Sequence, residues 1–191
     1  RGKIRKIRGL TPNLVAFFAY CAVEASTGLW AASFLVDQRG LSQVFAAAGA
    51  SAYYLGITVG RFLTGFLSSH FEARNLVRGG QAMILLGIGM LFLPFPILSL
   101  VGLMIVGLGC APIYPTLLHE TPRRFGAENS ASLMGIQMAV AYCGLTLMPP
   151  LLGLIVDRFG LQLYPLGLLL LALMLTFGTE RLNKVLAQQN T

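Results

Sequence analysis

The sequence contains little charge. Only 11% of its 191 residues are charged, 55% are hydrophobic, and the mean hydropathy is +0.72. Soluble domains carry roughly 25% charged residues, so this composition excludes an ordinary soluble protein. The motifs HExxH and GxSxG are missing, as is any acid pair set beside a nucleophile. The sequence therefore does not predict an enzyme.

Cysteine is scarce, and the three that occur lie inside apolar stretches: Cys21, Cys110 and Cys143. Such cysteines are typical of small buried hydrophobic residues and indicate neither a disulfide framework nor a metal site. We therefore expect no metal and no cofactor. The net charge of +7 comes from short clusters of cations between apolar stretches. This pattern is typical of membrane topology and not of a nucleic-acid-binding face, so nucleic acid is not an expected partner.

Long apolar stretches dominate the chain instead. Residues 79–118 carry no charge, and a single helix of these 40 residues would be about 60 Å long, twice the hydrocarbon thickness of a bilayer. This stretch must form a hairpin, for which the sequence LPFP at Leu93–Pro96 is the natural turn. We predict an all-α integral membrane protein with six transmembrane helices, at Leu10–Val36, Val44–Ser69, Leu76–Leu93, Ile97–Leu118, Asn129–Val156 and Leu161–Thr179.

An even number of spans places both termini on one side of the membrane. The cations on that side are Arg1, Lys3, Arg5, Lys6, Arg8, Arg74, Arg78, Arg123, Arg124, Arg181 and Lys184, against Arg39 and Arg158 on the other. This asymmetry predicts that both termini are cytoplasmic. We expect a basic cytoplasmic linker at 1–9, a six-helix domain at 10–182 and a cytoplasmic tail at 183–191. The basic leader either reinforces this orientation or binds anionic lipid. Because the first residue is Arg1, we expect the chain to be part of a longer protein.

Glu24 is the only charged residue between Leu10 and Val36. A carboxylate at this depth costs several kcal/mol unless it is paired, protonated or open to water, so it is a candidate functional residue. Tyr20, Glu24 and Thr27 share one helix face, and Tyr54, Thr58 and Arg61 repeat that spacing in the second span. Pairing with Arg61 would keep Glu24 ionised, whereas an unpaired Glu24 would be a proton acceptor. A static ion pair between helices is the third alternative.

Four more side chains are candidates for a binding site. The amide of Gln137 is costly to bury alone, and it suits either sugar hydroxyls or a bond between helices. Trp30 suits either stacking on a pyranose ring or anchoring at the membrane interface. Tyr142 is a weaker candidate, as is Tyr114.

Small residues and prolines punctuate the apolar stretches. Gly56 and Gly60 form a face that lets a neighbouring helix backbone approach closely. Prolines interrupt the fourth span at Pro112 and Pro115 and the fifth at positions 149 and 150. Such prolines kink helices, either around a transport pathway or within a static bundle.

Four segments resemble the C-terminal half of a major facilitator superfamily transporter, in the branch of the fucose-permease-like sugar transporters. They are FAYCAVEASTGLWAASFLV at 18–36, GITVGRFLTGFLS at 56–68, GLGCAPIYPTLL at 107–118 followed by TPRRFG, and GIQMAVAYCGLTLMPPLLGLIVDRFG at 135–160. The resemblance implies half of a twelve-helix fold, built as two three-helix inverted repeats. The family's gating motif GxxxDRxGRR is altered after the second span, where Ser69 and His70 replace its aspartate and arginine. A better literal match, GLIVDRFG at 153–160, falls on the predicted outer side.

The resemblance implies secondary active transport of a small solute, a sugar or polyol, by alternating access with proton symport in a bacterial inner membrane. The expected partners are membrane lipid, the small-molecule substrate, and either an N-terminal six-helix half or a second copy of this chain. The alternatives are an efflux or metabolite transporter of the same fold and a structural half that does not transport. The residues expected in substrate binding or coupling are Glu24, Arg61, Gln137, Tyr20, Trp30, Tyr54 and Tyr142.

Overall fold

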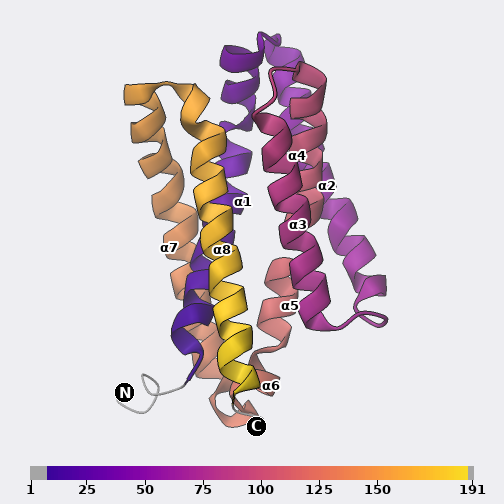
Figure 1. Ribbon diagram of the computed structural model, residues 1–191, viewed down its shortest axis with the longest axis vertical. Coiled ribbons are helices and arrows are strands. Elements are labelled where there is room, and N and C mark those ends of the chain that lie inside the picture. The colour runs from indigo at the N-terminus through magenta and orange to yellow at the C-terminus, as the bar shows by residue number, and fades with distance from the viewer. Residues whose placement is uncertain (1–7, 189–191) are drawn as a thin grey trace.

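The computed structural model describes residues 8–188, and within that range its secondary structure consists of helices joined by short turns (Figure 1). The long helices are α1 (Leu10–Arg39), α2 (Gln43–Leu67), α3 (Ala73–Leu91), α4 (Pro96–Cys110), α7 (Ala127–Phe159) and α8 (Tyr164–Ala187). The short elements are α5 (Ile113–His119), α6 (Thr121–Phe125) and the 3₁₀ turn η2 (Leu161–Leu163). The helices run roughly along the long axis of the molecule. The predicted segments 1–9 and 183–191 lie partly outside the described residues.

Local sequence signals account for several helix ends. Gly40 ends α1 in the left-handed region (φ 66°), where its N–H bonds the carbonyls of Leu35 and Val36. The hydroxyl of Ser42 accepts from the Phe45 N–H and caps α2. The turn between α3 and α4 occupies residues 92–95, so the predicted hairpin is confirmed.

The prolines act differently in the two spans that contain them, and the predicted interruption at Pro149 and Pro150 is absent. Pro112 lies between the end of α4 and the start of α5, so the predicted fourth span is two helices. Proline has no N–H to donate and its ring clashes with the preceding turn, which favours such a break. In contrast, α7 continues through Pro149 and Pro150.

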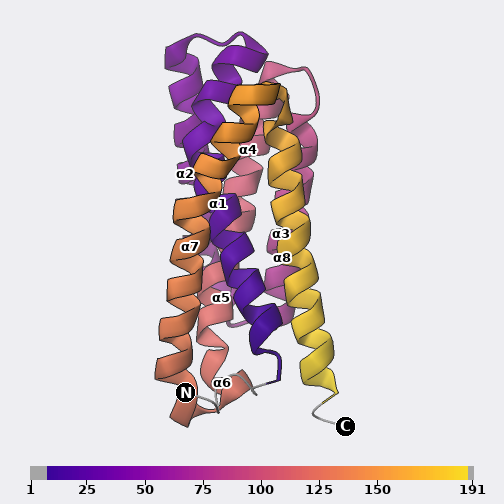
Figure 2. The ribbon, with the colours of Figure 1, turned by 90° about the vertical axis from the view of Figure 1, so that its left-hand side faces the viewer.

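Helix α1 is the centre of the bundle. It packs against α2, α7 and α8, while α4 joins α2 to α3 (Figure 2). Its buried face includes Phe17, Phe34 and Leu35, and these side chains belong to the main apolar core. The guanidinium of Arg39 ties the end of α1 to the α3–α4 hairpin, because it donates to the Leu91 carbonyl (2.6 Å) and the Ser99 hydroxyl (2.9 Å).

Glycines allow the closest approach between helices. A Cβ on Gly56 of α2 would lie 2.5 Å from the Met104 carbonyl oxygen of α4, and one on Gly60 would lie 2.5 Å from the Ala111 Cβ. The contact is reciprocal, since Gly107 of α4 lies against the Tyr53 carbonyl. The predicted small-residue face on the second span therefore does pack against a neighbouring backbone.

Among residues 8–188, four helical segments are long and apolar enough to cross a membrane: Leu10–Arg39, Pro96–His119, Ala127–Phe159 and Leu161–Ala187. The prediction of six spans is thus confirmed only in part. Helix α2 contains Arg61 and two adjacent tyrosines, and α3 begins with Arg74 and Arg78, which lowers their apolar character.

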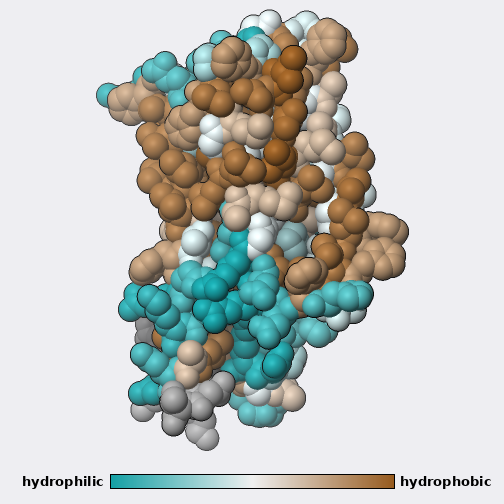
Figure 3. Space-filling view, turned by 45° about the vertical axis from the view of Figure 1, so that its right-hand side comes forward, coloured by the Kyte–Doolittle hydropathy of each residue, from teal (hydrophilic) through white to brown (hydrophobic). Residues whose placement is uncertain are grey.

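The two described ends of the chain lie at the same end of the molecule, as predicted (Figure 1). Figure 3 shows that this end is largely hydrophilic, whereas the opposite part of the same face is mainly hydrophobic. Large apolar side chains are exposed along the helices, including Phe62 (69%) on α2 and Leu154 (69%) on α7. An exposed apolar surface of this extent is typical of contact with lipid or with another membrane segment.

Candidate functional site

Glu24 and Arg61 form an ion pair between α1 and α2. The Arg61 Nη2 lies 3.5 Å from the Glu24 Oε1. Of a paired and an unpaired Glu24, the two possibilities that the sequence left open, the structure shows the paired one. The pair is not sealed in the core, because 27% of the Glu24 side chain and 54% of the Arg61 side chain are exposed. Each charge lowers the cost of holding the other inside the bundle, and both side chains keep part of their surface exposed.

Two adjacent tyrosines of α2 contact α1 around Glu24. The buried Tyr53 donates its hydroxyl proton to the main-chain carbonyl of Glu24 (2.9 Å). Tyr54 is 54% exposed, and its hydroxyl lies against Gly28, one turn beyond Glu24. Sequence spacing selected Tyr54, which shares a face with Arg61, but it missed Tyr53. The sequence shows only that the two tyrosines are adjacent. Adjacency does not predict a hydrogen bond from Tyr53 to the main-chain carbonyl of Glu24.

An aromatic cluster continues the site toward α5 and α7. Tyr20 is buried, and its ring lies 5.8 Å from that of Tyr114, which in turn lies 5.5 Å from Phe17. The Tyr20 hydroxyl has no hydrogen-bond partner among residues 8–188. Tyr142 of α7 is 65% exposed and lies near Tyr114. The structure thus groups four expected residues, Glu24, Arg61, Tyr20 and Tyr54, and adds Tyr142 through Tyr114.

Gln137 and Trp30 lie within helix contacts and not on the open surface. The Gln137 side chain is fully buried, and its Oε1 accepts from the Thr121 hydroxyl (3.1 Å). Its amide nitrogen has no partner within the described part of the chain. The Trp30 indole N–H donates to the Pro149 carbonyl (3.0 Å), and its ring packs on Gly153 of α7. These contacts match the interhelical alternative for Gln137 and a helix-packing role for Trp30.

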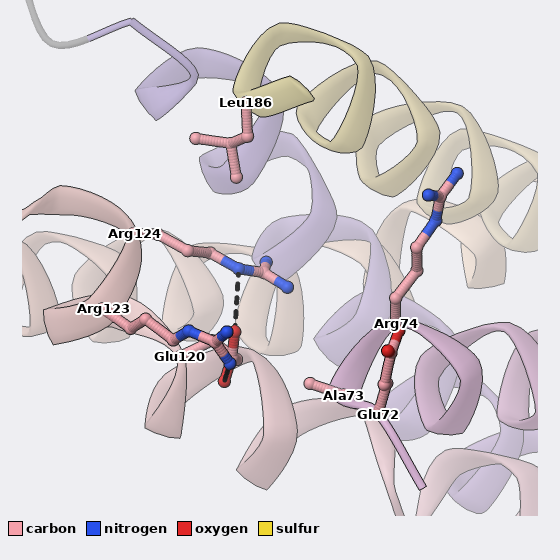
Figure 4. Close-up of a pocket in the computed structure, with 7 residues that line it drawn as sticks. All are labelled: Glu72, Ala73, Arg74, Glu120, Arg123, Arg124 and Leu186. Carbon is pink, nitrogen blue, oxygen red and sulfur yellow. Dashed lines mark ion pairs between the residues drawn. The ribbon is translucent and has the colours of Figure 1, made fainter. Parts of the chain in front are cut away.

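A pocket of about 710 Å³ runs from Arg61 to the polar end of the molecule. The wall farthest from Arg61 is shared with a second pocket of about 380 Å³ (Figure 4). The shared residues include Glu72, Glu120 and Arg123. Figure 4 shows Arg123 and Arg124 of α6 pointing toward Glu120, with ion-pair distances of 3.8 and 3.5 Å. Burial lowers the pKa of Arg124, and the charge of Glu120 opposes that shift. Charged side chains therefore line the pocket between the Glu24–Arg61 pair and the polar end of the molecule.

The altered gating motif forms no ion pair within the described residues. Ser69 and His70 are exposed and bond to each other (2.9 Å) after the end of α2. The better literal match, with Asp157 and Arg158, lies at the opposite end of the molecule, as the predicted topology requires. Within residues 8–188, no group of three or more His, Cys, Asp or Glu is placed to hold a metal ion.

Comparison with known proteins gives two sequence relatives. The chain is 27% identical over 164 residues to bypass of stop codon protein 6 of Saccharomyces cerevisiae, covering 78% of this chain and 32% of that protein. It is 28% identical over 102 residues to the glucose/mannose transporter GlcP of Bacillus subtilis, covering 53% of this chain and 25% of that protein. The chain therefore spans no more than a third of the length of these relatives.

The fold is similar to that of solved transporters. It matches a major facilitator superfamily transporter, FucP, in the outward conformation, with a TM-score of 0.81 and 17% identity over 94% of this chain and 44% of that one. It also matches a variant of the E. coli fucose:proton symporter FucP, with a TM-score of 0.76 and 18% identity over 95% of this chain and 44% of that one.

The sequence pattern of the Major Facilitator Superfamily matches residues 13–187, nearly the whole chain. The structural relatives named above are transporters and not enzymes. The all-helical bundle, its exposed apolar surface and this match agree, and the chain belongs to the major facilitator superfamily.

Proposed function

We propose that this chain is the C-terminal six-helix half of a secondary active transporter that moves a sugar or polyol with proton coupling. The observation that carries the proposal is the partly exposed Glu24–Arg61 pair between α1 and α2. The names of two relatives add support, since one is a glucose/mannose transporter and the other a fucose:proton symporter.

Coupling would follow because a proton and Arg61 compete for the carboxylate of Glu24. In the resting pair, Arg61 lies 3.5 Å from Glu24. A proton that reaches Glu24 neutralises the carboxylate, breaks the pair and frees the donors of Arg61. A guanidinium has five N–H donors, which suit the oxygen atoms of a polyhydroxy solute. Proton and solute would thus bind together, as symport requires.

The solute would lie against the open surface formed by Tyr54, Tyr142 and Arg61. Exposed aromatic rings offer apolar faces to the C–H side of a sugar, and their hydroxyls bond its polar side. Gln137 and Trp30 support this surface from within the helix contacts that hold α6 and α7 in place.

Six spans would be organised as two inverted three-helix repeats, the first from α1 to α3 and the second from α4 to α8. Alternating access would come from rocking against an N-terminal half or a second copy of this chain. The polar end with both described termini would face the cytoplasm of a bacterial cell, with the bundle in the inner membrane.

The decisive experiment is uptake of a panel of hexoses and polyols into liposomes that contain the chain together with its partner half. We expect uptake of at least one sugar to require an inward proton gradient. Glu24→Gln mimics the protonated carboxylate, so uptake should persist down the sugar gradient but lose its dependence on the proton gradient. Asp157→Asn, which removes an exposed acid at the other end, is the control and should leave coupling intact.

Unchanged proton dependence in Glu24→Gln would reduce the pair to a static contact between helices. Transport of drugs or other metabolites in place of sugars would favour the alternative of an efflux or metabolite transporter. A chain that transports nothing with either partner would be a structural half.

A further inference from the structure

A groove of about 530 Å³ lies between the start of α1 and the end of α8, away from the Glu24–Arg61 pair. Figure 2 shows these two segments side by side near the end of the molecule that carries both termini. The helices approach closely here, because a Cβ on Gly178 would lie 3.1 Å from the Pro12 carbonyl oxygen and the Ala16 nitrogen. The groove therefore lies at the surface of a close contact between α1 and α8.

The groove is apolar in its deeper part and basic toward the end of the molecule. Pro12 and Val15 of α1 and Phe177 of α8 form the apolar part, and Arg8 and Arg181 are the charged residues of the lining. None of its ten lining residues is acidic. The Arg181 guanidinium lies 5.8 Å from the Phe177 ring centre, so its aliphatic stem follows the apolar part.

The two arginines are not neutralised by the described residues. Neither forms an ion pair within residues 8–188, whereas the adjacent Glu180 is held by Arg78 of α3 at 2.7 Å. The sequence just before Arg8 adds four more cations, Arg1, Lys3, Arg5 and Lys6. This charge attracts an anion and disfavours the leader itself as the occupant.

We propose that this groove binds an anionic phospholipid, with the phosphate between Arg8 and Arg181 and an acyl chain along Pro12, Val15 and Phe177. Phe177 lies one helical turn, roughly 6 Å, deeper than Arg181 along α8. The order of basic residues and then apolar residues matches the order of phosphate and acyl chain in a lipid leaflet. A free phosphate would leave most of the 530 Å³ unfilled.

Native mass spectrometry of the full chain in detergent tests the site, with phosphatidylglycerol and phosphatidylcholine as probes. Each cation near a membrane surface changes the affinity for anionic lipid about fivefold, so Arg8→Gln with Arg181→Gln should weaken phosphatidylglycerol binding about 25-fold. Arg8→Lys with Arg181→Lys keeps both charges and should keep most of the affinity. Arg123→Gln with Arg158→Gln removes two exposed arginines elsewhere and should change the affinity little.

Equal binding of the two lipids by the unaltered chain would overturn the proposal, as would the same loss in the Arg123/Arg158 control. Displacement of phosphatidylglycerol by inorganic phosphate would show a simple anion site in its place. Full affinity in the Arg8/Arg181 glutamine variant would mean that the groove has another occupant, residues 1–7 or a second copy of the chain. Helical circular dichroism of each variant confirms that the fold is retained, and transport of a sugar is not part of any readout.

Discussion

The Glu24 carboxylate has an arginine partner and is still open to its surroundings. Partly exposed ion pairs contribute little to stability, because solvent screens them and both side chains lose freedom. The 3.5 Å separation and the 54% exposure of Arg61 place this pair in that class. A pair that contributes little to stability is not needed to hold α1 and α2 together, so the coupling role proposed above does not conflict with the packing of these helices.

A double-mutant cycle measures the pair directly. Arg61→Gln leaves the Glu24 carboxylate without a cation, so we expect it to lower the free energy of unfolding by about 1 kcal/mol. Adding Glu24→Gln removes the unpaired charge and should restore most of that loss. Thermal unfolding in detergent provides the readout. Losses that simply add in the double variant would show that the two charges do not interact.

Substitution of Gln137 distinguishes a role in solute binding from a role in helix packing. Its side chain is fully buried and bonded to Thr121, so Gln137→Ala removes a hydrogen bond and leaves a cavity. We expect a loss of about 2–3 kcal/mol in unfolding free energy, with the solute affinity of the folded fraction unchanged. A matched Thr121→Val should show a smaller loss of about 1 kcal/mol. Loss of solute affinity at full stability would place Gln137 in the binding site.

At the level of elements, glycines set how closely the helices pack. Gly56 of α2 lies against the α4 backbone, where an added Cβ would be 2.5 Å from the Met104 oxygen. Backbone cannot move aside as a flexible side chain can, so α2 and α4 would have to separate. Gly65, in the same helix, has no atom within 4 Å of an added Cβ.

These two glycines form a matched pair of substitutions. Gly56→Ala should destabilise the protein by roughly 1–3 kcal/mol through overpacking. Gly65→Ala should be neutral or stabilise it by up to about 1 kcal/mol, because alanine favours helix more than glycine does. Unfolding followed by circular dichroism compares them. Equal effects of the two substitutions would show that the α2–α4 contact is not as close as described.

At the scale of the whole molecule, the two ends differ in charge and should face different compartments. Arg123 lies at the polar end with the described termini, and Arg158 lies at the opposite end. Cysteines introduced singly at these exposed positions, in a chain whose own cysteines are replaced by alanine, report on sidedness. In intact cells, a membrane-impermeant maleimide should label Arg158→Cys and not Arg123→Cys. The reverse labelling would invert the predicted orientation.

Residue patterns predicted most of the fold, because a bilayer restricts the secondary structures that can cross it. Low charge, apolar stretches of span length and the uncharged segment 79–118 predicted helices, a hairpin at LPFP and termini at one end. The break at Pro112 was also foreseen, because a missing N–H acts locally. The number of spans was supported less well, since α2 and α3 carry charges whose tolerance depends on their neighbours.

The sequence by itself predicted helices and placed Glu24 near the middle of the first one, because these follow from composition and from the pattern of apolar residues along one chain. The family came from the resemblance of four segments and from the match over residues 13–187. Only the tertiary structure decided which side chains meet. It paired Arg61 with Glu24, directed the Tyr53 hydroxyl to the Glu24 carbonyl and enclosed Gln137 and Trp30 between helices. Helical spacing gives the face on which a residue lies, but the rotation and separation of neighbouring helices decide what that face contacts.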